Sequence, residues 1–156
     1  MLKYIVAFIG MGLLLSSCDK EEDLKSTDEI LTFGQFYGFC GGEECIEIFK
    51  MDHNSIREDT LDEYPSNSFY SGQYVELSTE KFNQAKDLFD DFPVKLLTEQ
   101  DTVIGIPDGG DWGGYYVEYK KGDIHRMWLL DKMKDNVPAD YHNFMDKMNA
   151  KIELLK

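Results

Sequence analysis

The side chains with the clearest chemistry are cysteines and histidines. Cys40 and Cys45 enclose the sequence Gly-Gly-Glu-Glu, whose two glycines permit a tight reversal at the end of a hairpin. An even pair of cysteines predicts a disulfide if the chain is exported, as the amino-terminal segment described below indicates. Half of a zinc site is an alternative, although His53, His125 and His142 show no paired spacing that would complete it. A redox pair is a third interpretation, but such pairs are usually Cys-x-x-Cys.

A glycine-rich loop at 107–114, Pro-Asp-Gly-Gly-Asp-Trp-Gly-Gly, carries the next candidate site. Calcium takes about six to eight oxygens in loose geometry, so Asp108 and Asp111 could contribute ligands, with Trp112 beside them. The spacing does not match an EF-hand loop. Phosphate binding is disfavoured because two acids repel an anion and no lysine or helix start follows. The alternative is a wide glycine loop before a hairpin, with Trp112 packed on a neighbour.

Catalytic patterns are missing from the sequence. It contains no Gly-x-Ser-x-Gly and no cysteine–histidine pairing, and nothing singles out two of its 30 acidic residues as a catalytic pair. We therefore expect a non-enzymatic protein with no catalytic residue, no bound metal and no cofactor. Tyrosines could instead form a recognition surface, or they could pack within the fold. The tyrosines in question are Tyr70, Tyr74, Tyr115 and Tyr116.

The amino-terminal segment has the pattern of a secretory signal. Lys3 precedes the uncharged run 4–15, which is too short for a membrane-spanning helix of about 20 apolar residues. The closing sequence Leu-Ser-Ser-Cys resembles a bacterial lipobox. This resemblance implies cleavage of a signal peptide, residues 1–17, and lipidation of Cys18 with several acyl chains, which hold a protein stably at a bilayer. A permanent span and an ordinary secreted protein cut after a small residue are the alternatives.

Cleavage before Cys18 would leave 139 residues with 15 basic and 30 acidic side chains. We expect an acidic tether at 18–29 and a single globular domain at 30–156. Such a negative surface disfavours nucleic acid and anionic lipid as partners. The acidic run 19–23 resembles the signal that sends lipoproteins to the outer surface in Bacteroidetes. That resemblance implies a lipid-anchored, surface-exposed protein of the outer membrane. The periplasmic face and a plain solvated linker are the alternatives.

Alternating apolar residues predict an antiparallel arrangement of strands. In the second predicted strand the alternation slips between Ile48 and Phe49, which indicates a bulge or burial on both faces. Pro138 suits the first position of a closing helix. An earlier helix is expected to begin after Ser78 and to stop before Pro93. The predicted strands are 31–39, 45–51, 56–61, 69–77 and 102–106, followed by a hairpin at 115–130 with its turn at 121–123.

This order predicts an α+β fold: an antiparallel sheet of about five to seven strands with two amphipathic helices on one face. Segments 33–50 and 111–119 resemble small Bacteroidetes surface lipoproteins without an assigned activity, so the resemblance implies location and no mechanism. We expect a lipid-anchored interaction or structural module whose protein or small-molecule partner the sequence does not define. The alternative is a surface component that binds or degrades small molecules or carbohydrates near 107–114.

Overall fold

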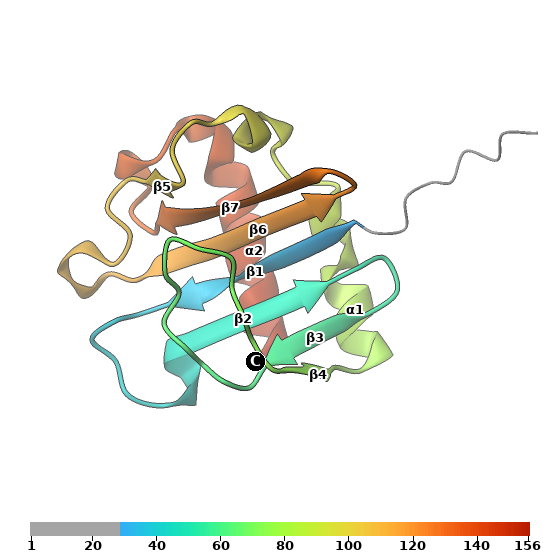
Figure 1. Cartoon of the computed structure of the whole chain (residues 1–156). Coiled ribbons are helices and arrows are strands. Elements are labelled where there is room, and N and C mark those ends of the chain that lie inside the picture. Colours follow the sequence, from blue (N-terminus) through green and yellow to red (C-terminus); the bar gives the residue numbers. More distant parts are fainter. Residues whose placement is uncertain (1–28) are drawn as a thin grey trace, which may run out of the picture.

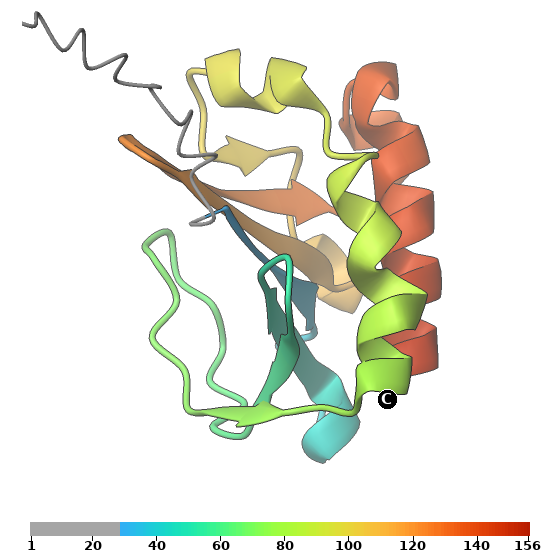
Figure 2. The ribbon, with the colours of Figure 1, turned by 90° about the vertical axis from the view of Figure 1, so that its right-hand side faces the viewer.

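The computed structural model describes residues 29–156, which form a seven-stranded sheet with two α-helices packed on one face (Figures 1 and 2). This confirms the α+β fold. The predicted signal peptide, the lipidation site Cys18 and all of the predicted tether except Glu29 lie outside the described residues.

The strands are β1 (Ile30–Phe36), β2 (Ile46–Met51), β3 (Ile56–Asp59), β4 (Tyr74–Glu76), β5 (Val103–Ile104), β6 (Gly114–Lys121) and β7 (Ile124–Asp131). The α-helices are α1 (Thr79–Ala85) and α2 (His142–Leu155). Short 3-10 helices are η1 (Glu43–Cys45), η2 (Lys86–Phe89), η3 (Val94–Thr98), η4 (Gly109–Asp111), η5 (Lys134–Asn136) and η6 (Ala139–Tyr141).

The sheet has the strand order β4-β3-β2-β1-β6-β7-β5, and its neighbouring strands are antiparallel except for β5 and β7. The sheet is therefore mostly antiparallel, as predicted, with β5 as a parallel addition at its edge. After β4 the chain leaves one edge of the sheet, passes through α1 and reaches the other edge, where it pairs parallel to β7. The loop 105–113 and the hairpin of β6 and β7 then reverse the chain twice, so β5 and β7 run in the same direction.

Strand β2 resolves the slip in the apolar pattern. Its register with β1 runs without interruption from Leu31 opposite Met51 to Phe36 opposite Ile46, so it contains no bulge. Phe49 packs into the core under the helices, whereas Ile48 packs into a smaller cluster on the other face. Burial on both faces is therefore the correct interpretation.

Four predicted strands are shorter than expected by two residues or more, one of them being 56–61, which ends at Asp59 as β3. The first ends at Phe36 rather than at residue 39, since the chain turns away into the loop that precedes β2. The predicted strand 69–77 is reduced to β4, because residues 60–73 leave the sheet and cross the face opposite the helices (Figure 2). The predicted strand 102–106 is reduced to β5, which ends before Gly105, whose φ is 80°.

The first helix is capped as predicted, because the Ser78 hydroxyl accepts a hydrogen bond from Lys81 N. It does not continue to residue 92 as an α-helix. After Ala85 the chain winds more tightly through η2, which still brings Leu88 and Phe92 into the core before Pro93. The predicted start of the last helix at Pro138 is also early, because η6 intervenes and α2 begins at His142.

The main core lies between the sheet and the helices, where side chains from α1, η2 and α2 meet the strands. Trp128, Phe144 and Met148 are fully or almost fully buried there. A second, smaller cluster lies on the opposite face, under residues 60–73. Its buried members are Phe36, Ile48, Tyr116 and Met127, with Ile46, Tyr70 and Leu129 partly buried against them.

Candidate functional site

The candidate residues at 40, 45, 108, 111 and 112 gather at one end of the sheet. The loop 37–45 connects β1 to β2, and the loop 105–113 leads into β6. Because Phe36 at the end of β1 pairs with Gly114 at the start of β6, the two loops are neighbours. We call these segments the distal loops, since they lie at the end of β1 opposite Glu29 (Figure 1).

A disulfide closes the first distal loop. Cys40 and Cys45 are bonded, with their Cα atoms 5.7 Å apart, which confirms the prediction. The backbone reinforces the loop, because Tyr37 N donates to Cys45 O at 3.0 Å. Gly42 has a φ of 126°, a conformation that favours glycine. The disulfide therefore closes a short loop whose ends are also joined by a backbone hydrogen bond.

Asp108 joins the distal loops to each other and to the segment 60–73. Its carboxylate accepts hydrogen bonds from Gly38 N at 2.8 Å, Tyr64 OH at 3.0 Å and Gly113 N at 3.0 Å. Burial and the Asp108 carboxylate together raise the pKa of Tyr64 to about 12. The backbone of Asp108 has a φ of 60°, which aspartate tolerates better than most residues. Three segments far apart in the sequence thus depend on one carboxylate.

Asp111 and Trp112 are exposed, and the three hydrogen bonds of the Asp108 carboxylate involve neither of them. The calcium hypothesis requires several oxygen ligands around one point. Within residues 29–156, no group of three or more His, Cys, Asp or Glu side chains is placed to hold a metal ion. The carboxylate of Asp108 already accepts two backbone N–H groups and a hydroxyl. This loop is therefore organised by its own hydrogen bonds in the structure.

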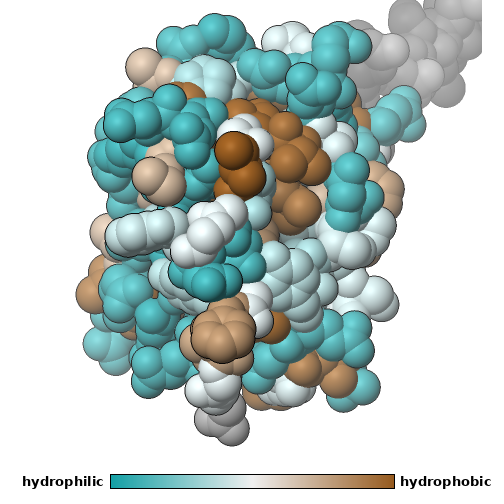
Figure 3. Space-filling view, turned by 90° about the vertical axis from the view of Figure 1, so that its left-hand side faces the viewer, coloured by the Kyte–Doolittle hydropathy of each residue, from teal (hydrophilic) through white to brown (hydrophobic). Residues whose placement is uncertain are grey.

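Large apolar side chains protrude from the distal loops. Phe39 is 88% exposed, Ile106 67% and Trp112 64%. Figure 3 looks onto this end of the molecule, where brown, hydrophobic side chains stand among teal, hydrophilic ones. Isolated exposed apolar residues are common on proteins, but here three of them come from two loops joined through Asp108. The sequence analysis missed Phe39 and Ile106 because the apolar alternation placed both of them in strands.

The tyrosines do not form a common recognition surface. Tyr115 and Tyr116 are buried, and Tyr70 and Tyr74 are half-buried. Burial, followed by a hydrogen bond to Glu118, raises the pKa of Tyr116, whose hydroxyl also accepts from Tyr70 N at 2.8 Å. The hydroxyls of Tyr70 and Tyr116 therefore fasten the segment 60–73 to the sheet, which agrees with the alternative that these residues pack within the fold.

A cavity of about 370 Å³ lies where the segment 60–73 meets β7. Phe69 stacks on His125 with ring centroids 3.7 Å apart, and His125 Nε2 lies 2.8 Å from Glu118 Oε1. Thr102 donates to Asn67 Oδ1 at 2.7 Å across the same region. Sequence reasoning missed this arrangement, because its residues are dispersed between positions 67 and 127 without a common pattern.

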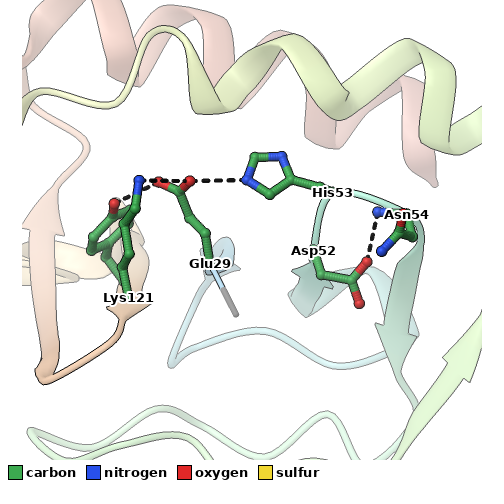
Figure 4. A network of polar contacts seen from close by, with 6 residues as sticks. Glu29, Asp52, His53, Asn54 and Lys121 are labelled. Carbon is green, nitrogen blue, oxygen red and sulfur yellow. Dashed lines mark hydrogen bonds and ion pairs between the residues drawn. The ribbon is translucent and has the colours of Figure 1, made fainter. Parts of the chain in front are cut away.

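At the end opposite the distal loops, Glu29 fastens the start of the domain (Figure 4). Its carboxylate accepts from Tyr119 OH at 2.5 Å and Lys121 Nζ at 3.1 Å, and it lies 2.9 Å from His53 Nε2. Burial opposes ionisation here, but the hydrogen bonds outweigh it and lower the pKa of Glu29. Glu29, the last residue of the predicted tether, thus already belongs to the folded domain.

No family model matches the chain, and no curated protein matches it. Within the part of the chain that the structure describes, no helix has the length and apolar character needed to cross a membrane. The fold and the surface define an α+β domain with a disulfide-closed loop and exposed apolar side chains at one end.

Proposed function

We propose that this chain is a lipid-anchored protein of the outer membrane or cell surface, and that its domain is a non-enzymatic interaction module. The lipobox-like sequence ending at Cys18 supports the anchor. The Cys40–Cys45 disulfide supports export, because stable disulfides persist mainly in oxidising compartments. The chain joins the domain at Glu29, so the distal loops lie at the end of the sheet away from the anchored segment.

The observation that carries the binding role is the set of apolar side chains held out from the distal loops. Phe39 and Trp112 are aromatic, and aromatic residues are enriched among the residues that dominate binding energy at interfaces. Asp108 and the disulfide fix the two loops before binding. Binding by fixed loops loses less conformational entropy than binding by loose ones. The partner in this proposal is a protein whose own surface presents an apolar patch.

Crosslinking in intact cells tests the binding role. A photoreactive amino acid at position 112 of the full chain should crosslink one partner, and Phe39→Ser should weaken that crosslink. The same photoreactive residue in place of Val94, which is 74% exposed but lies in η3, is the matched control. Equal crosslinking at both positions, or a Phe39→Ser variant that crosslinks as strongly as the parent, would contradict a specific surface at the distal loops.

A second candidate function is binding of a carbohydrate or another small molecule at Trp112. An exposed indole beside a carboxylate can stack on a sugar ring. The chain has two tryptophans, of which Trp112 is exposed and Trp128 is buried. Intrinsic fluorescence therefore reports on Trp112 when a ligand contacts the distal loops. A blue shift that saturates with an oligosaccharide, and that is lost in Trp112→Ala, would favour this candidate over a protein partner.

Metabolic labelling with a fatty-acid probe tests the anchor. Cys18→Ala should abolish the label, because the lipid is attached to the cysteine sulfur. Ser17→Ala keeps a small residue before the cysteine and should retain the label. Undiminished labelling of the Cys18→Ala variant would overturn the proposed anchor, whatever the distal loops bind.

A further inference from the structure

A cavity of about 400 Å³ lined by acidic side chains lies near the β3–β4 edge of the sheet, at the carboxyl end of α2. Glu44 comes from η1, Glu47 from β2 and Glu58 from β3, while Lys156 follows the last residue of α2. Its volume falls within the range of small-ligand sites, which is about 300–1,000 Å³. The cavity adjoins the loop 37–45 through Glu44, but Phe39, Ile106 and Trp112 are not among its lining residues.

Glu47 is the unusual member of this group. Glu47 is only 8% exposed. Among the described residues, apart from the side chain of Glu43, none forms a hydrogen bond or a salt bridge with it. Buried carboxylates in proteins are normally paired, because an ionised group loses its hydration on burial. The residue is thus largely covered, but its carboxylate oxygens remain open to the cavity and receive no hydrogen bond from the described residues.

A nearby acid shows how this chain satisfies a buried carboxylate elsewhere. Asp59, on the next strand, is also buried. It accepts hydrogen bonds from Tyr70 OH at 2.6 Å, Gln73 N at 2.6 Å and Asp62 N at 3.1 Å. Its carboxylate therefore needs nothing from outside the chain. No described residue donates a hydrogen bond to Glu47. Of these two buried acids, Glu47 is therefore the one that needs a hydrogen-bond donor from a ligand.

The charges around Glu47 favour a cation. Burial and the neighbouring carboxylate of Glu58 raise the pKa of Glu47 to about 7, and the charges of Asp62 and Glu44 act in the same direction. Lys156 lowers this pKa, but its ammonium group also lies 2.9 Å from Glu153 Oε1. Among the described residues that line the cavity, acidic side chains therefore outnumber basic ones.

We propose that this cavity binds a small organic cation, a ligand with an alkylammonium or guanidinium group, with Glu47 as its buried counter-charge. Both groups donate several charge-assisted hydrogen bonds to carboxylates. A volume of about 400 Å³ accommodates such a group together with its carbon chain, whereas a bare metal ion would leave most of it unfilled. The cation could belong to a free amine or to a lysine or arginine side chain of another protein.

Binding should depend on pH with a defined sign. The cation remains charged between pH 6 and pH 8, because amines and guanidinium groups of this kind have pKa values of about 10 or higher. Glu47 is mostly protonated at pH 6 and mostly ionised at pH 8, since its pKa is about 7. The affinity should therefore be roughly tenfold weaker at pH 6 than at pH 8.

Calorimetric titration of the full chain in detergent tests the proposal, with agmatine as the probe because it carries both cationic groups. At pH 8, Glu47→Gln should weaken binding about tenfold or more, as expected for loss of a charge-assisted contact. It should also abolish the difference between pH 6 and pH 8. Glu76→Gln removes one exposed carboxylate from β4 and is the matched control, which should bind like the parent.

Lys156→Met should tighten binding, because it removes the positive charge that lines the cavity. Circular dichroism should show that all variants are folded. A peptide containing one arginine, titrated in parallel, shows where the bound cation comes from. Binding of agmatine alone indicates a free amine, whereas binding of both agmatine and the peptide indicates a side chain of another protein. Agmatine that fails to bind, or that binds Glu47→Gln as tightly as the parent, overturns the proposal. Calcium bound through Glu47 in place of agmatine would overturn it as well.

Discussion

The distal loops depend on Asp108, and its replacement by asparagine gives a defined test. Asparagine has nearly the same size and tolerates the φ of 60°, so the change acts on the hydrogen bonds. An amide can turn only one oxygen toward the donors of Gly38, Tyr64 and Gly113, whereas the carboxylate serves all three. A hydrogen bond to a charged group contributes about 1.5–3 kcal/mol, and the site is partly exposed. We therefore expect Asp108→Asn to lower the free energy of unfolding by about 2 kcal/mol.

Chemical denaturation and thermal melting measure this loss, which should correspond to a decrease in Tm of about 6 °C for a domain of this size. Asp111→Asn is the matched control, because Asp111 also has a positive φ, of 63°, but is exposed. Its stability should stay within about 0.5 kcal/mol of the parent. An Asp108→Asn variant as stable as Asp111→Asn would refute the role of Asp108 as the connection between the loops. A calcium-induced rise in Tm that both variants abolish would instead identify the loop 107–114 as a calcium site.

Reduction of the Cys40–Cys45 bond should lower the free energy of unfolding by about 2 kcal/mol, because the loop that it closes is short. Denaturation with and without reductant, with alkylation and intact-mass measurement, checks this value, and complete unfolding on reduction would contradict it. Glu47→Gln should stabilise the domain by roughly 3 kcal/mol at pH 8 and by less toward pH 5. The folded state holds the Glu47 proton up to about pH 7, whereas the unfolded chain releases it near its ordinary pKa, so stability falls as pH rises between these values. Urea denaturation at both pH values measures the difference, and an equal effect at pH 5 and pH 8 would contradict the raised pKa.

Local patterns in the sequence determined the elements whose stabilising contacts are close along the chain. The hairpin 115–130 has strongly β-forming residues on both arms and a two-residue turn, so it was predicted nearly to its limits. The Ser78 cap and the disulfide also involve residues at most five positions apart. In these cases the interacting partners lie within one turn or loop, where residue type and spacing are sufficient for prediction.

The tertiary structure decided the features whose partners are distant in sequence. Residues 69–73 were predicted to belong to the strand 69–77, yet Tyr70 is held on the second face by a hydrogen bond to Tyr116, 46 positions away. The pairing of β5 parallel to β7 likewise depends on where the crossover through α1 returns to the sheet.

The candidate sites follow the same division. Asp108 was recognised as an unusual acid, but its partners Gly38 and Tyr64 lie 70 and 44 positions away, so its role was visible only after folding. Glu47 alternates with apolar neighbours like an ordinary solvent-facing strand residue. In the structure it lies on the same face of β2 as the core residues Phe49 and Met51, in a cavity that Lys156 at the end of α2 also lines. Sequence spacing reports which face of a strand a side chain occupies, whereas long-range packing determines whether water or protein covers that face.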